Sequence, residues 1–205
     1  MGRFGPWRER VLRLTSGGHQ QMGAAWATHK VDLRRSFETT FDAFLHEGRS
    51  GADGIAIVLQ TEGTRALGGW GGGLGYRGIR NSVAIEFDDF KNAPDPSDNH
   101  VGLVVNGNPD AHLVTADPDI PLFGAPFRAR VGYDARSHHL QVHVGTPDQG
   151  EPEQQLVIDQ RIDLAGRLGA GSAWAGFTGA TGDVVSQQDI LSWEVSARPP
   201  APRRR

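Results

Sequence analysis

The sequence predicts an all-β protein, built as an antiparallel sandwich or barrel. Short stretches of alternating apolar and polar residues recur along the 205-residue chain. This period of two is typical of strands that bury one face. The 28 glycines and 12 prolines follow no fixed period, and clusters of turn residues separate the alternating stretches, as in an all-β domain.

The expected strands share this alternation and end at turn residues. They cover residues 11–15, 36–45, 54–60, 83–87, 100–105, 127–133, 139–144, 174–180 and 190–196. Helical periodicity is nearly absent, and 164–171 (LAGRLGAG) is the one short helical candidate. We expect a single domain over 1–197, followed at 198–205 by a proline-rich basic tail that is typical of a linker or disordered segment.

Composition excludes several classes of function. The net charge of -3 does not favour nucleic acid as a partner. With no cysteine, any metal must bind through oxygen and imidazole ligands. No apolar run approaches the ~18 residues of a transmembrane helix, so no membrane insertion is expected. The N-terminus lacks the apolar stretch of a signal peptide, so either the protein is not exported by that route or the chain is a fragment of a larger exported protein.

An acidic segment carries the strongest chemical signal. Residues 83–105 read VAIEFDDFKNAPDPSDNHVGLVV. Alternate residues of a strand share a face, about 6.6 Å apart, so Glu86 and Asp88 point away from the core together, which is unfavourable unless a cation joins them. Asp95 in the following loop and His100 at the next strand can converge on the same point. Oxygen ligands suit calcium, and a site that includes an imidazole suits manganese or another transition ion.

Spacing alone leaves two other interpretations of this segment open. A solvated acidic turn is the usual meaning of such a run. Paired carboxylates also serve glycosidases, and β-sandwich glucanases carry Glu-x-Asp-x-Glu on one strand. Here Phe90 stands where the third carboxylate would be, which argues against hydrolysis.

Several segments in order resemble the legume-type (L-type) lectin family. IEFDDFKN…DPSDNHVGL resembles its metal-binding stretch, GADGIAIVLQ (51–60) an early carbohydrate-loop strand, and GGGLGYRGIRNSVAIEFD (71–88) its glycine loop. Residues 124–135 and 174–196 resemble later strands. The pattern covers most of the chain and is closer to bacterial members than to plant ones. It implies an antiparallel jelly-roll β-sandwich, as in concanavalin-like lectins, with the site on loops at one end of the concave sheet.

The resemblance also implies two metal ions. The manganese ligands of the family match Glu86, Asp88, Asp95 and His100. Its calcium ligands match Asp88, the Phe90 carbonyl, Asn92 and Asp95. Asp89 departs from the Thr or Ser often found at its position, but it points to the opposite face from Asp88, so we expect the metal shell to survive.

The sugar-binding residues of the family are an Asp, a Gly and an Asn. Asp53, which follows a cis peptide bond in the family, matches the Asp. Gly72 matches the Gly, with Gly73 as the alternative, and Asn92 matches the Asn. Phe90 stands where the family places a ring against the sugar. The variable specificity loop matches 183–188, which begins with Asp183 and Val184.

Two other signals have competing interpretations. Residues 73–78 form a literal GxGxxG, but a strand follows it and no helix pattern does, so we interpret it as a chance match and not a nucleotide site. Trp70 beside the glycine loop is either a sugar-stacking ring or a packed loop residue, because aromatic rings serve both roles.

We therefore expect a non-catalytic, calcium-dependent lectin that binds a glycan or glycoconjugate. The alternatives are a glycan-active hydrolase of the same sandwich fold and an adhesion module that has lost sugar binding. The family is extracellular or secreted, and its members pair their sheets in several ways, so a homo-oligomer is compatible with the resemblance.

Overall fold

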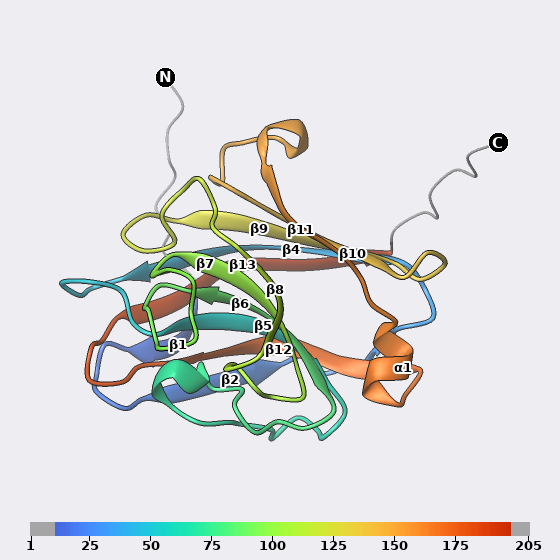
Figure 1. Cartoon of the computed structure of the whole chain (residues 1–205), viewed down its shortest axis with the longest axis horizontal. Coiled ribbons are helices and arrows are strands. Elements are labelled where there is room, and N and C mark those ends of the chain that lie inside the picture. Colours follow the sequence, from blue (N-terminus) through green and yellow to red (C-terminus); the bar gives the residue numbers. More distant parts are fainter. Residues whose placement is uncertain (1–10, 198–205) are drawn as a thin grey trace.

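The computed structural model describes residues 11–197 and consists of two antiparallel sheets packed face to face (Figure 1). The six-stranded sheet contains, in spatial order, β1 (Leu12–Ser16), β13 (Gln187–Ala197), β4 (Phe37–His46), β9 (Phe127–Asp134), β10 (His139–Gly145) and β11 (Gln155–Arg161). The seven-stranded sheet contains β2 (Met22–Trp26), β12 (Ser172–Ala180), β5 (Gly54–Gln60), β6 (Ser82–Asp88), β7 (His100–Val105) and β8 (His112–Ala116), with β3 (Val31–Asp32) paired to β12. The predicted all-β sandwich is confirmed.

All nine expected strands are present, with ends that differ by three residues or fewer. Four strands were not expected: β2, β3, β8 and β11. They are short or lack a clean alternation, and β2, β8 and β11 lie at sheet edges, where burial imposes less pattern on the sequence. The helical candidate forms α1 (Leu164–Leu168), and two short 3-10 turns lie at η1 (Gly71–Gly73) and η2 (Glu151–Glu153). The predicted tail at 198–205 lies outside the described residues.

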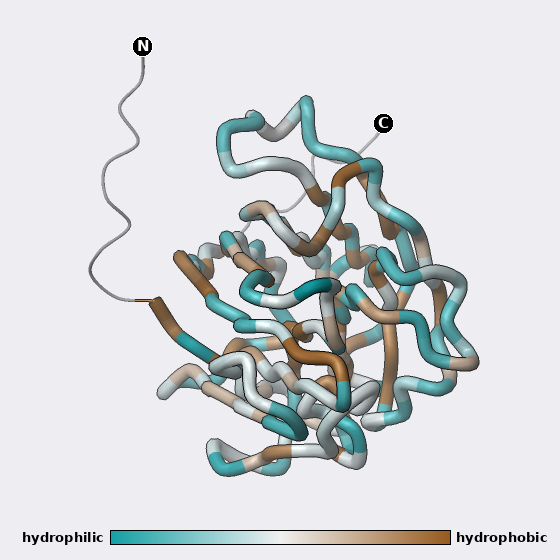
Figure 2. Tube along the Cα trace, turned by 90° about the vertical axis from the view of Figure 1, so that its left-hand side faces the viewer, coloured by the Kyte–Doolittle hydropathy of each residue, from teal (hydrophilic) through white to brown (hydrophobic). Residues whose placement is uncertain are grey.

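The main core fills the space between the two sheets. Phe41 of β4 is fully buried and meets Phe87, Phe127 and Phe177 edge to face, with ring centroids 4.9–6.5 Å apart. Such aromatic contacts add stability beyond the area they bury. Figure 2 shows the apolar segments inside the molecule and mostly hydrophilic loops around it. None of the helices among residues 11–197 has the length and apolarity to cross a membrane.

A second, smaller core lies on the outer face of the seven-stranded sheet. Leu74, Tyr76 and Ile79 of the glycine loop pack there against residues of β5, β6 and β7, and all of these side chains are buried. The strand residues are Ala56, Val58, Ala84 and Val104. The loop therefore covers the sheet face that carries the predicted metal ligands.

Candidate functional site

Strand register brings the predicted ligands together at one end of the seven-stranded sheet. Gly54 at the start of β5 pairs with Asp88 at the end of β6, and Asp88 pairs with His100 at the start of β7. Glu86, two residues before Asp88, pairs with Gly102. Because paired residues and i, i+2 neighbours share a face, Glu86, Asp88 and His100 lie together beneath the glycine loop.

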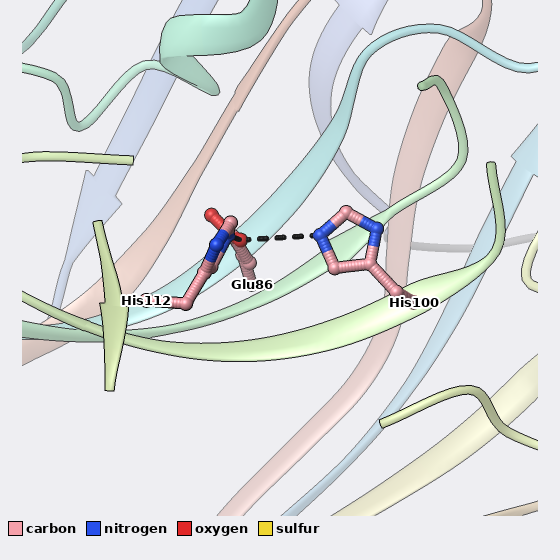
Figure 3. A group of neighbouring side chains, drawn as sticks. All are labelled: Glu86, His100 and His112. Carbon is pink, nitrogen blue, oxygen red and sulfur yellow. Dashed lines mark hydrogen bonds and ion pairs between the residues drawn. The ribbon is translucent and has the colours of Figure 1, made fainter. Parts of the chain in front are cut away.

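Glu86 is the centre of a buried polar cluster. Tyr76 Oη donates a hydrogen bond to Glu86 Oε2, and His112 Nε2 hydrogen-bonds to Glu86 Oε1. His100 Nε2 lies 3.4 Å from the same Oε1 and makes no hydrogen bond, although His100 is fully buried. Figure 3 shows the three side chains of Glu86, His100 and His112 side by side. Burial raises the pKa of the Glu86 carboxyl, but the neighbouring imidazoles and the tyrosine outweigh it and leave this pKa below its ordinary value.

Two aspartates order the loop that follows β6. Asp88 Oδ1 accepts a hydrogen bond of 2.8 Å from the Phe90 amide, and Asp95 Oδ2 accepts one of 2.6 Å from the Asn92 amide. Both aspartates are buried. Burial, together with the nearby carboxylates of Glu86 and Asp95, raises the pKa of Asp88 well above its ordinary value. The loop thus brings several acidic side chains close together.

The residues present fit divalent cations. Glu86, Asp88 and Asp95 are each less than 9% exposed, and buried carboxylates require a compensating charge. The buried Nε2 of His100 has no hydrogen-bond partner, as expected of an imidazole nitrogen that ligates a metal. Ligand atoms of Glu86, His100 and His112 all lie within 4.8 Å of one another. This group is therefore able to hold a metal ion.

Asp53 lies beside this cluster with an unpaired oxygen. The peptide bond between Ala52 and Asp53 is cis, as the resemblance implies. Asp53 is 4% exposed, and its Oδ2 has no hydrogen-bond partner. Burial, followed by the charges of Asp183 and Asp95, raises the pKa of Asp53 to about 6. An oxygen in this position is available to accept a hydrogen bond from a ligand.

The glycine loop and the specificity loop flank Asp53. Cβ atoms placed on Gly71 and Gly182 would lie 3.9 Å and 3.2 Å from Asp53 Oδ2. A Cβ on Gly72 would overlap with Asn92 Oδ1, whereas one on Gly73 would meet the Arg77 side chain. Gly72 is therefore the glycine adjacent to Asn92.

Buried polar contacts fix the base of the specificity loop. Ser186 Oγ donates to the Ala52 carbonyl at 2.8 Å, and Gln188 Nε2 donates to the Ala180 carbonyl at 2.8 Å. Before these anchors in the chain, Asp183 is exposed and Val184 is half-buried. The rim of the site also includes half-buried Phe90 and Trp70, which is 49% exposed. The ring of Trp70 is therefore accessible.

Asp89 is a buried acid that sequence reasoning treated as harmless. It is 6% exposed, and neither carboxyl oxygen has a hydrogen-bond partner. It lies against Gly51, where any side chain would overlap with Asp89 Oδ2. Burial and the charge of Asp53 raise its pKa to about 7.

Two residues of the site were missed from the sequence. Tyr76 was read as part of a glycine loop, and His112 was not assigned to a strand. The turn-forming NGNPD between two alternating stretches is the available signal for His112, because it predicts that the two flanking segments pair.

Two alternative interpretations lose support in the structure. Residues 73–78 are followed by a loop and β6, not by a helix, so the nucleotide fingerprint lacks its required context. Glu86 is buried and hydrogen-bonded to Tyr76 and His112, which is unlike a carboxylate that faces a substrate cleft.

Comparison with known proteins is consistent with this geometry. The model of the legume lectin β-barrel domain matches residues 6–192. A lectin of Onobrychis viciifolia is 30% identical over 80% of this chain and 68% of its own length. The L-type lectin-domain containing receptor kinase IV.2 of Arabidopsis thaliana is 29% identical over 94% of this chain. The match covers only 32% of the length of that kinase. The lectin of Bauhinia forficata in complex with GalNAc superposes with a TM-score of 0.78 at 29% identity, over 93% of this chain and 88% of that one.

Proposed function

Because the chain belongs to the legume lectin family, we propose that it binds a glycan through the loops around Asp53, in a manner that depends on bound metal. Members of the family are lectins, so the prediction of a non-catalytic carbohydrate-binding domain is confirmed at this level. The observation that carries the proposal at this site is the unpaired, buried Oδ2 of Asp53.

Sugar hydroxyls need acceptors and donors in fixed positions. We assign the acceptor to Asp53 and the donors to the Asn92 side-chain amide and the Gly72 backbone N–H, which lie next to each other. The ring of Phe90 provides an apolar surface for the sugar ring, and Trp70 is accessible for a second contact. Asp183 and Val184 occupy the loop that would select among sugars. GalNAc, bound by the Bauhinia lectin, is a sensible first probe.

We assign two metal positions from the family resemblance, and the burial of Glu86, Asp88, Asp95 and His100 supports the assignment. Glu86, Asp88, Asp95 and His100 would hold a transition ion such as Mn²⁺. Asp88, the Phe90 carbonyl, Asn92 and Asp95 would hold Ca²⁺, which favours oxygen ligands. When bound, these ions supply the positive charge that buried carboxylates require. Asp88 and Asp95 already hydrogen-bond the amides of Phe90 and Asn92, so they fix the loop that presents the Asn92 side chain.

The wider setting is also part of the proposal. The relatives include a lectin and a receptor kinase, which supports an extracellular location and a glycoconjugate partner. The chain covers only part of the receptor kinase, so a larger parent protein is compatible with this picture. A homo-oligomer would raise avidity, since single lectin sites are commonly weak. The closer resemblance to bacterial members stays a prediction.

A glycan array, probed with and without a chelator, tests the function. We expect binding in Ca²⁺ and Mn²⁺, loss with chelator and recovery on adding metal back. Metal at 100 times its dissociation constant should also raise the free energy of unfolding by about 2.7 kcal/mol.

Asp53→Asn tests the assigned acceptor. Removing a charged acceptor should weaken binding about 10- to 100-fold, whereas the exposed control Asp148→Asn should bind normally. Equal binding by Asp53→Asn would contradict the site assignment, and no signal from the unmodified protein would favour an adhesion module that has lost sugar binding.

A further inference from the structure

We propose that His112 is a direct ligand of the transition-metal position, and that two imidazoles make this position prefer Zn²⁺ over Mn²⁺. This inference rests on the proposed metal site and adds a residue to it. His112 Nε2 hydrogen-bonds to Glu86 Oε1, and His100 Nε2 lies 3.4 Å from the same oxygen. The two rings are nearly perpendicular, with centroids 5.4 Å apart, so they reach Glu86 from different strands.

The fold makes room for this second imidazole by omitting a side chain. Gly102 of β7 lies between Glu86 of β6, with which it pairs, and β8. A Cβ at Gly102 would stand 2.5 Å from Glu86 Oε1 and 2.8 Å from His112 Cδ2. Because residue 102 is glycine, the His112 side chain can extend over β7 and contact the Glu86 carboxylate.

Neighbouring contacts orient the donor atoms toward one point. Tyr76 Oη binds Glu86 Oε2 and leaves Oε1 for the imidazoles. His100 Nδ1 lies 3.2 Å from the Ser97 carbonyl, which can only accept a hydrogen bond, so Nδ1 is the donor there and Nε2 is the ring atom left to ligate a metal. Arg77, next to Tyr76, holds Asp110 with two hydrogen bonds of 2.6 and 2.8 Å and so ties the glycine loop to the turn before His112.

The donor set determines which ion is favoured. Mn²⁺ is well served by carboxylate, carbonyl and water oxygens, whereas imidazole suits Zn²⁺, Ni²⁺ and Cu²⁺, which also stand above Mn²⁺ in intrinsic affinity. A site with one histidine and three carboxylates offers mostly the oxygen ligands that suit Mn²⁺. Adding His112, whose side chain is 10% exposed, moves the same pocket toward zinc. The competing interpretation is that His112 only forms an ion pair with Glu86.

Zinc binding to the metal-free full chain distinguishes these interpretations. We compare the unmodified protein with His112→Ser, with His112→Gln, which keeps an amide donor for Glu86, and with the control His139→Ser on the exposed surface. X-ray absorption of the zinc-loaded protein should count two imidazoles, falling to one in both His112 variants. Zinc affinity measured by calorimetry should fall by more than about 100-fold, beyond the 10- to 100-fold that loss of an outer partner costs, while Mn²⁺ affinity falls less.

The outcomes separate this inference from the proposed function. One imidazole in the unmodified protein, or unchanged zinc affinity in His112→Gln, overturns the role of His112 even when Ca²⁺-dependent glycan binding is intact. Absence of any metal uptake by the unmodified protein overturns both. Circular dichroism of each metal-free variant identifies a loss of fold, and His112→Gln gives the decision if His112→Ser does not fold.

Discussion

Gly102→Ala is the sharpest test of how the metal cluster is built. The added methyl would lie 2.5 Å from Glu86 Oε1 and 2.8 Å from His112 Cδ2, both far inside normal contact distance. Neither neighbour can move away freely, because Glu86 is 1% exposed and hydrogen-bonded at both oxygens, and the His112 side chain is 10% exposed and is one of these partners. Overpacking of this kind costs about 1–3 kcal/mol. We therefore expect a loss near 2 kcal/mol in the free energy of unfolding, or about 4–8 °C in Tm for a domain of this size.

Denaturant unfolding of the metal-free protein measures this loss directly. Gly150→Ala is the control, since its Cβ would meet nothing closer than 3.7 Å. Adding His112→Ala removes one of the two clashing groups, so the double variant should recover at least about 0.5 kcal/mol relative to the sum of the single changes. If Gly102→Ala unfolds like the control, the proposed crowding at Glu86 is wrong.

Three further predictions concern acid, metal and core. Asp89→Asn should stabilise the metal-free protein at pH 7 and above by up to about 4 kcal/mol. A pKa raised to about 7 means that the folded state favours the protonated acid, so the native protein loses stability as pH rises from about 4 to 7. Urea unfolding at pH 4 should show no gain for Asp89→Asn, and a gain there would contradict this prediction. Metal should leave as pH falls toward about 5, since the carboxylates of both positions and the imidazole of the transition-ion position bind only when deprotonated; equilibrium dialysis that retains Ca²⁺ or Mn²⁺ at pH 4 would refute this. Phe41→Ala, at a fully buried ring, should cost about 3–5 kcal/mol in thermal or denaturant unfolding, whereas exposed Leu67→Ala should change little.

The alternation in β6 was enough to predict which way its side chains point. Ile85 and Phe87 enter the main core between the sheets, and Glu86 and Asp88 lie on the other face. This prediction succeeds because strand geometry is local and has a period of two. The same locality explains why the strands that bury one face were found and the short edge strands were not.

His112 could not be placed by local pattern. It lies 26 residues beyond Glu86 and starts β8, a five-residue edge strand of partly exposed residues. Its position depends on two hairpin pairings, β6 with β7 and β7 with β8, and on a missing side chain at Gly102. A one-residue slip in either pairing would turn the imidazole to the opposite face. Contacts of this kind depend on the strand register. The register is set by the turns between strands and cannot be derived from composition.

The burial of Glu86 connects the metal cluster to the sugar site. A glutamate on the outer face of a sheet is normally solvated, but here the glycine loop packs over this face and its Tyr76 hydrogen-bonds to Glu86. The same loop carries Gly72, which lies against Asn92 in the loop after β6. The same loop therefore has two roles. Its Tyr76 covers the buried carboxylate of Glu86, and its Gly72 supplies the backbone N–H that we expect to contact the sugar. Loss of the metal would change the charge around Glu86 and so disturb the packing of the loop that also forms the glycan site. This is a physical reason to expect sugar binding to depend on metal.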